Sequence, residues 1–238
     1  MIKLHHLENS RSVRILWVLE ELGIEYELKT YKRLPSGLAP PELKAVDPLG
    51  HAPILEDDGH TVAESGAIIE YLVEKYGGGK YTNSDDAFWK HYIEGSLMPF
   101  CVFKLVLSKG IESIPWYLRS VLAVVPRAIL SQWVDPNLNN AVEIVDKQLK
   151  GKQGWAVGGD VDGNPTIADF MLGFTIDVLA FGGRLEHVGE GIKSYAERLQ
   201  SYPSYKKANN YKRLSKNQAT IAIKPHYKAK KNRIKEIV

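Results

Sequence analysis

The sequence contains a single cysteine, Cys101, among its 238 residues. One cysteine excludes an internal disulfide and a zinc site built mainly from thiolates, and it favours a reducing compartment. Long apolar runs are also scarce. Residues 120–130 form the longest candidate, but Pro126 and Arg127 interrupt them and they fall short of the roughly 18 residues of a membrane span. The first twelve residues lack the apolar core of a signal peptide. We therefore expect a globular protein of the cytoplasm.

An excess of charge of one sign is found only at the carboxyl end of the chain. The formal net charge is +3, but residues 212–238 carry nine Lys or Arg against one acid, so the rest of the chain carries −5. A mildly acidic body argues against a nucleic-acid-binding domain. The basic tail has three interpretations: a solvated extension, a nucleic-acid contact, and a contact with anionic lipid. Five residues would add apolar surface to the lipid contact: Ile221, Ile223, Ile234, Ile237 and Val238. The nucleic-acid contact is the least favoured interpretation, because bases stack on aromatic side chains and Tyr227 is the only aromatic residue of the tail.

Residue types that hold metal ions show no ligand spacing. His5 and His6 are neighbours in an expected strand, so their side chains point to opposite faces. Asp160, Asp162 and Gly163 resemble part of a calcium loop, but they lack its twelve-position spacing and closing glutamate. We expect no metal site.

The first eighty residues alternate between strand and helix patterns. Apolar residues predict strands at 1–7 and 26–31, joined by a helix that begins after Asn9 and ends at Gly23. An Asp-Gly pair at 58–59 predicts a hairpin. With a short helical segment near 42–46 and a helix at 64–75, the predicted order is β-α-β-α-β-β-α, which is an α/β fold with a mixed sheet.

Beyond the glycine triplet at 77–79 the strand signals disappear and helical periodicity dominates. The predicted helices cover 85–107, 137–149, 166–181 and 192–201. Thr166 and Asp169 have the spacing of a capping box at the start of one of them. We therefore predict three parts: an α/β domain at 1–79, an all-α domain at 85–211 and a basic tail at 212–238.

Three features of the first domain point to a ligand site. Ser10 follows the first strand at the start of a helix, where a hydroxyl either caps the helix or donates a hydrogen bond to an anion. Ala52-Pro53 precedes a strand, and a cis bond there would turn the backbone of Ala52 toward a ligand. Glu64 and Ser65 start another helix, either as simple capping residues or as partners for an ammonium and a carboxylate. Together they would suit a small zwitterionic peptide that carries a thiol.

The motifs that contain these residues resemble the cytosolic glutathione transferase family over about residues 1–210. The resemblance rests on the segments 10–22, 47–55 and 63–72, and in the second domain on 166–169 and 201–205. The segment Pro40–Lys44 is most similar to fungal transferases associated with the endoplasmic reticulum and to bacterial relatives. The family implies a thioredoxin-like first domain, an all-helical second domain and a homodimer.

The resemblance also implies roles for single residues. Ser10 would donate a hydrogen bond to the sulfur of glutathione, and Asn9 is the alternative donor. His51 matches the position that contacts the glycyl carboxylate. The backbone of Ala52 would pair with the cysteinyl part beside cis-Pro53. The γ-glutamyl end would be held by two residues at a helix start, Glu64 and Ser65.

The function implied is conjugation of glutathione to small hydrophobic electrophiles, as in detoxification and stress responses. Two alternatives stay open: a glutathione-dependent peroxidase of organic hydroperoxides, and a catalytically silent assembly module. The electrophile would lie in a cleft between the domains, with four aromatic residues as walls: Phe100, Phe103, Trp116 and Tyr117. We expect glutathione as co-substrate, no metal, no nucleic acid, and a cytoplasmic location with peripheral contact to the endoplasmic reticulum through the basic tail.

Overall fold

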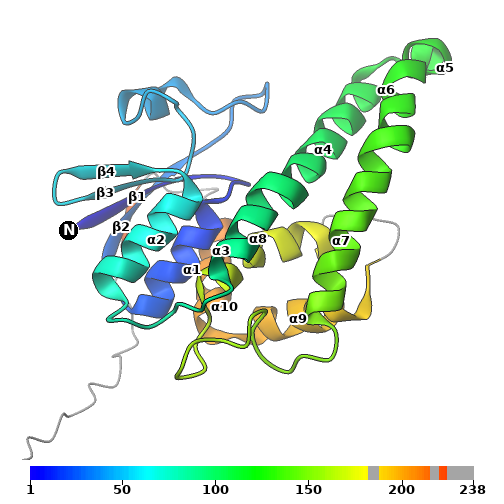
Figure 1. The fold of residues 1–238 in the computed structure, drawn as a ribbon. Helices are drawn as coiled ribbons and strands as arrows, with labels where there is room; N and C mark the ends of the chain where they lie inside the picture. Colours follow the sequence, from blue (N-terminus) through cyan, green and yellow to red (C-terminus); the bar gives the residue numbers. More distant parts are fainter. Residues whose placement is uncertain (182–187, 215–219, 224–238) are drawn as a thin grey trace, which may run out of the picture. The chain divides into compact units, whose positions relative to one another are not determined.

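The computed structural model describes residues 1–181, 188–214 and 220–223. The chain forms two compact units, one made of Met1–Lys80 together with Gln200–Val238 and the other of Tyr81–Leu199. Figure 1 shows the elements of each unit. By packing, the helix α10 (Pro203–Leu214) groups with the first eighty residues, because it lies against α1 (Ser12–Leu22). The sequence had placed residues 200–211 with the helical part instead.

A mixed sheet forms the centre of the first unit. Its strand order is β4-β3-β1-β2-β5, with β1 (Ile2–Leu7) parallel to β2 (Tyr26–Tyr31). β3 (Ile54–Asp57) runs antiparallel to β1 and pairs with β4 (His60–Ala63) through the predicted hairpin. Leu4 lies opposite Leu28 on one side and Leu55 on the other, and none of the three is exposed. The three leucines form a buried row across the sheet, and this burial requires each strand to keep its register.

β5 (Thr220–Ile223) corrects one expectation. No strand was predicted beyond the glycine triplet, yet β5 pairs antiparallel with β2, with Ile221 opposite Leu28. A short run of β-branched residues pairs readily with the edge strand of a sheet. Here the edge strand lies about 190 residues away in the sequence, so local periodicity does not reveal the pairing. Ile221 and Ile223 therefore sit in a strand of this sheet. The tail residues 224–238, to which the three interpretations of the basic tail mainly apply, lie outside the described residues.

Two helices lie side by side against the sheet, α1 and α2 (Ser65–Tyr76) (Figure 1). α1 ends as predicted at Gly23, which adopts φ +66°, and the amide of Ile24 donates to the carbonyl of Leu19 at 3.1 Å. Between β2 and β3, a 3₁₀ turn at Pro41–Ala45 takes the place of the predicted short helical segment. The Ala52-Pro53 peptide bond is cis.

The second unit contains helices and loops, and no strand in its described part. The long helix predicted at 85–107 consists of α3 (Asp86–Tyr92), a π-helical turn (Ile93–Leu97) and α4 (Met98–Ser113). α4 packs against α7 (Asp135–Leu149), and between them the chain turns through a 3₁₀ turn (Trp116–Leu118), α5 (Arg119–Leu122), α6 (Val124–Ile129) and a second π-helical turn (Leu130–Val134). Figure 1 shows these elements as a long helical hairpin.

α8 (Ile167–Phe181) is the buried helix of this unit, and α9 (Glu190–Ser201) follows it. The carboxylate of Asp169 accepts from the amide of Thr166 at 2.9 Å, as a capping box requires. The hydroxyl of Thr166 differs from the prediction: it lies 2.6 Å from Asp86 Oδ1, and it is this carboxylate oxygen that accepts from the amide of Ala168. The carboxylate of Asp86 in α3 thus accepts from an amide at the start of α8, which was the role predicted for the side chain of Thr166.

Candidate active site

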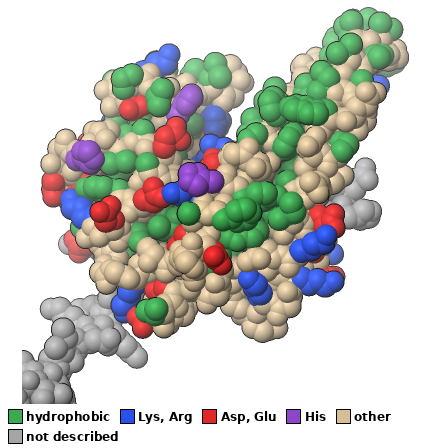
Figure 2. Space-filling view, in the orientation of Figure 1, with side chains coloured by type: hydrophobic (Ala, Val, Ile, Leu, Met, Phe, Trp, Pro, Cys, Tyr) green, Lys and Arg blue, Asp and Glu red, His purple; other side chains and the backbone are tan. Residues whose placement is uncertain are grey.

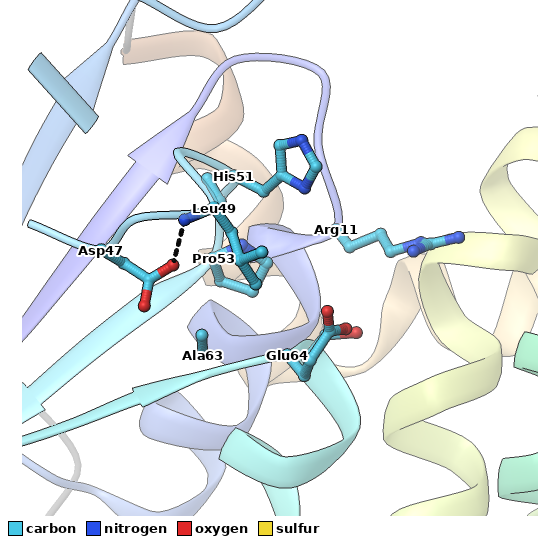
Figure 3. A pocket seen from close by; sticks show the side chains of 9 residues that line it. Arg11, Asp47, Leu49, His51, Pro53, Ala63 and Glu64 are labelled. Atoms are coloured by element: carbon cyan, nitrogen blue, oxygen red, sulfur yellow. Dashed lines mark hydrogen bonds between the residues drawn. The ribbon is translucent and has the colours of Figure 1, made fainter. Parts of the chain in front are cut away.

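A pocket in the first unit gathers residues from three separate segments of the chain. It lies where the start of α1, the loop before β3 and the start of α2 meet (Figure 3). The lining residues are Arg11, Asp47, Leu49, His51, Ala52, Pro53, Ala63, Glu64 and Ser65. Pro53 lies in the middle of this group, with His51 on one side and Ala63 and Glu64 on the other (Figure 3). Polar and charged side chains therefore surround a small apolar floor.

The loop before β3 is held by a tight turn at Asp47. Its carboxylate Oδ1 accepts from the amide of Leu49 at 3.0 Å, and its carbonyl accepts from the amide of Gly50 at 2.9 Å (Figure 3). Gly50 adopts φ +62°, and a Cβ there would stand 2.5 Å from the Cγ of Lys44. Only glycine fits this turn, which fixes where His51 and Ala52 enter the pocket.

Glu64 takes an unusual backbone conformation just before α2. Its φ is +70°, a region that residues with a Cβ rarely occupy, and its carbonyl still accepts the first helical hydrogen bond from Ile68 at 2.9 Å. Such a conformation costs free energy and is found most often where a site requires it. Here it leaves the carboxylate of Glu64 exposed at the pocket.

Ser65 connects the pocket to a buried positive charge. Its side chain is buried, and Oγ accepts a hydrogen bond from Nη1 of Arg14 at 3.0 Å. Arg14 belongs to α1 and is itself only 1% exposed. The guanidinium behind Ser65 and the amino terminus of the twelve-residue α2 both favour an anion at this end of the pocket. With Glu64 beside it, the same end presents complementary charges to an ammonium and a carboxylate.

Ser10 lies at the start of α1 but does not line the pocket. Its Oγ accepts from the amide of Ser12 at 3.3 Å, and the hydroxyls of Ser10 and Ser12 are hydrogen-bonded to each other. Ser12 also lies 3.5 Å from the carbonyl of Leu7, to which it donates. Ser10 Oγ thus accepts from the amide of the first residue of α1, while the neighbouring Arg11 lines the pocket.

Comparisons with known proteins identify the family. Residues 1–74 match the family model described as the N-terminal domain of glutathione S-transferase. Glutathione S-transferase 3 of Schizosaccharomyces pombe is 39% identical over 163 residues, which are 66% of this chain and 67% of the relative. Glutathione S-transferase 1 of Saccharomyces cerevisiae is 32% identical over 192 residues, 75% of this chain and 80% of the relative. The chain belongs to the glutathione S-transferase family.

A solved structure extends the similarity to most of the chain. A glutathione S-transferase from Actinobacillus pleuropneumoniae shares 32% identity and a TM-score of 0.69, and the match covers 92% of this chain and 97% of that one. The predicted thioredoxin-like first domain followed by a helical second region is confirmed, and so is the prediction of an enzyme of this family that uses glutathione as co-substrate.

Within this transferase, the five residues predicted to bind glutathione come together. His51, Ala52, Pro53, Glu64 and Ser65 all line the same pocket, although His51 and Glu64 lie 13 positions apart in the chain. The two candidates for the sulfur do not line it. Asn9 is exposed with φ +50°, and its carbonyl accepts from Arg33 Nη2 at 3.3 Å.

Sequence reasoning missed four residues of the transferase pocket: Arg11, Asp47, Leu49 and Ala63. Arg11 directly follows Ser10, and Asp47 begins the Asp-Pro-Leu-Gly segment that carried part of the resemblance. The signal available in the sequence was the turn-forming pattern of that segment. An aspartate side chain that accepts from the amide two residues later is typical of a rigid turn.

The four aromatic residues predicted as walls for the electrophile form two groups. Phe100 and Phe103 lie in α4, and both rings contact Trp133 at 5.4 Å between centroids. Trp116 and Tyr117 contact each other in the turn that follows α4, with exposed fractions of 80% and 63%. Among the residues that the structure describes, no three His, Cys, Asp or Glu side chains converge as metal ligands.

Proposed function

We propose that this glutathione transferase conjugates the thiolate of glutathione to small hydrophobic electrophiles. The observation that supports the proposal is the pocket in which His51, Ala52, Pro53, Glu64 and Ser65 meet beside the start of α1. Its charges are arranged for a peptide with an ammonium and a carboxylate at one end and a second carboxylate at the other.

The peptide's γ-glutamyl end fits the end of the pocket at α2. The carboxylate of Glu64 would pair with its ammonium, while Ser65, with Arg14 behind it, would hold its carboxylate. The exposed His51 at the opposite side would contact the glycyl carboxylate. The backbone of Ala52 would then face the cysteinyl part, which directs the thiol toward the start of α1.

The reaction requires a thiolate, which a free thiol provides poorly at neutral pH. A pKa near 8.5 leaves about 3% thiolate at pH 7, and lowering it to about 6.5 requires about 2.7 kcal/mol. One hydroxyl donor to an anion contributes about 1.5–3 kcal/mol and a helix amino terminus about 0.3–1 kcal/mol. The start of α1 can supply both contributions. The O–H of Ser10 supplies the first when it turns from Ser12 toward the sulfur, and the amino terminus of the helix supplies the second. Lowering the pKa of the thiol therefore requires no metal.

The test uses the purified protein on immobilised glutathione and in two assays, one with an aryl halide and one with an organic hydroperoxide. Retention on glutathione with conjugation of the aryl halide is the expected result. Reduction of the hydroperoxide without conjugation of the aryl halide would contradict the proposal and identify the protein as a glutathione-dependent peroxidase. A protein that flows through the glutathione column would contradict the assignment of the pocket.

The resemblance also supports a homodimer in the cytoplasm that works in detoxification. In the described parts of the chain, no helix is both long enough and apolar enough to cross a membrane. Size-exclusion chromatography with light scattering tests the dimer directly, since the monomer mass is 26.7 kDa.

A further inference from the structure

One arginine fastens the loop that leads from β1 into α1. The guanidinium of Arg33, in the loop after β2, donates to three backbone carbonyls, and a different nitrogen makes each hydrogen bond. Nε lies 3.1 Å from the carbonyl oxygen of Glu8, Nη2 lies 3.3 Å from that of Asn9, and Nη1 lies 2.9 Å from that of Gly37. A guanidinium holds its donors in one rigid plane, so it fixes the acceptors relative to one another. Arg33 therefore ties the loop after β1 to the loop after β2.

The backbone and the side chain of Glu8 reinforce this connection. Its amide donates to the carbonyl of Tyr31 at 3.1 Å, and its carboxylate Oε1 accepts from the amide of Arg33 at 3.1 Å. Because β1 and β2 are parallel, the two loops leave the sheet at the same edge. The residues that directly precede Ser10 are thus held by a segment that begins at the end of β2.

The backbone of Asn9 shows why this loop needs support from outside. Its φ is +50°, in the left-handed region that asparagine enters more readily than most residues but still at a cost in free energy. A residue keeps such a conformation only when its surroundings hold it there. The carbonyl of Asn9 accepts from Arg33 Nη2, and the same peptide unit carries the amide of Ser10. The arginine therefore fixes the direction in which the chain enters Ser10.

We propose that Arg33 is a positioning residue for the hydroxyl of Ser10 in the transfer reaction. The inference rests on the proposed function, in which this hydroxyl donates to the thiolate of glutathione. Arg33 is not one of the residues that line the pocket, so it acts through the backbone of residues 8 and 9 rather than on the peptide itself. A hydroxyl stabilises an anion only at hydrogen-bond distance and with a nearly linear geometry. A small rotation of this loop would therefore lose most of that stabilisation.

This role separates turnover from affinity. The two ends of the peptide would be held by His51, Glu64 and Ser65, which lie on other segments of the chain. Loosening the loop after β1 should therefore leave the affinity for glutathione nearly unchanged. It should lower the fraction of bound glutathione that is ionised at neutral pH, and with it the rate of transfer.

The experiment compares Arg33→Gln with Lys32→Gln in the full chain. Each variant loses one positive charge from the same loop, and Lys32 is exposed. Three quantities are measured: turnover with an aryl halide, the dissociation constant for glutathione by calorimetry, and the pKa of the bound thiol from the absorbance of its thiolate. Arg33→Gln should lower turnover about tenfold and raise the thiol pKa by about one unit, with a dissociation constant within about twofold of the wild type. Lys32→Gln should resemble the wild type in all three.

Two further variants separate positioning from other effects. Arg33→Lys keeps the charge but cannot donate to three carbonyls in the same plane, so it should lose most of the turnover that Arg33→Gln loses. It also keeps the test open where melting curves show that Arg33→Gln does not fold. In the double variant Ser10→Ala/Arg33→Gln, turnover should equal that of Ser10→Ala alone, because the arginine acts through the hydroxyl.

Several results would overturn the inference. These are unchanged turnover and thiol pKa in Arg33→Gln, an equal effect of Lys32→Gln, wild-type turnover in Arg33→Lys, and losses that add in the double variant. A loss of affinity as large as the loss of turnover would also overturn it, since Arg33 would then act in binding. The proposed function fails separately, when the wild type itself neither binds glutathione nor conjugates the aryl halide.

Discussion

The two units of this transferase place their polar groups in opposite ways. In the first unit, charged and hydroxyl groups surround an open pocket, and one buried guanidinium, that of Arg14, supports it from behind. In the second unit, Asp86, Thr166 and Asp169 are buried at the start of α8, while most exposed side chains in the turn between α4 and α7 are apolar (Figure 2). The contrast predicts that the polar residues of the pocket act in ligand recognition, whereas the polar residues buried in the helical core act in folding. Substitutions in each unit should therefore change different observables.

The largest effect is expected for Asp169→Ala. This fully buried carboxylate accepts from the amides of Ala156 and Thr166 at 2.8 and 2.9 Å and from the hydroxyl of Tyr195 at 2.6 Å. Its removal leaves several buried donors without their acceptor, which should cost about 3 kcal/mol or more of unfolding free energy. Chemical denaturation measures the loss, with the exposed Asp162→Ala as control. A variant as stable as the wild type would break the comparison.

The next effect is expected in the first unit for Ser65→Ala. The substitution removes the hydroxyl that accepts from Arg14 and that would hold the γ-glutamyl carboxylate, so the dissociation constant for glutathione should rise about tenfold to a hundredfold. Isothermal titration calorimetry measures the binding, and the exposed Ser36→Ala in the same unit should bind normally. Unchanged affinity together with lost stability would show that this serine acts in folding rather than in recognition.

Ser10→Ala sharpens the comparison within the pocket region. The thiolate would lose its hydroxyl donor while the contacts to both ends of the peptide remain, so turnover should fall by at least about tenfold with nearly unchanged affinity for glutathione. Absorbance of the bound thiolate as a function of pH should show that the thiol pKa rises toward its ordinary value. Unchanged turnover would transfer the role to Asn9 or Ser12, which the corresponding alanine variants would then identify.

The smallest effect concerns the acid stability of the first unit. Burial alone would raise the pKa of Asp57, but hydrogen bonds from Lys75, Tyr76 and Tyr71 to Oδ2 outweigh it and lower the pKa to about 2. Because the folded pKa lies below the unfolded value of about 4, the stabilisation is complete above that value and is lost as the pH falls toward 2.

Asp57→Asn should therefore lower stability by about 1–2 kcal/mol at neutral pH and by less at pH 3. Melting temperatures of both proteins across this range measure the difference. A constant difference between variant and wild type at all pH values would contradict the role of the Asp57 charge.

Much of the first unit was predictable because its signals are local. The alternation at 26–31 gave β2 its bounds, Gly23 marked the end of α1, and the Asp-Gly pair at 58–59 produced the hairpin of β3 and β4. Each of these depends on side chains within a few residues of one another. The residues proposed to bind glutathione were chosen through motifs and line one pocket. Arg11 and Leu49 were missed, since nothing local indicates that two loops will face the same space.

The amino-acid sequence by itself determined the elements of the first eighty residues, their order and the family to which the chain belongs, because periodicity and turn signals depend on residues that are close together in the chain. Only the tertiary structure decided that β5 completes the sheet beside β2, that α10 packs on α1, and that a carboxylate from α3 serves the start of α8. It also decided which apolar residues stay exposed in the turn between α4 and α7. Val121 and Val125 have the spacing of core residues, and their exposure follows from the absence of any packing partner among the described elements.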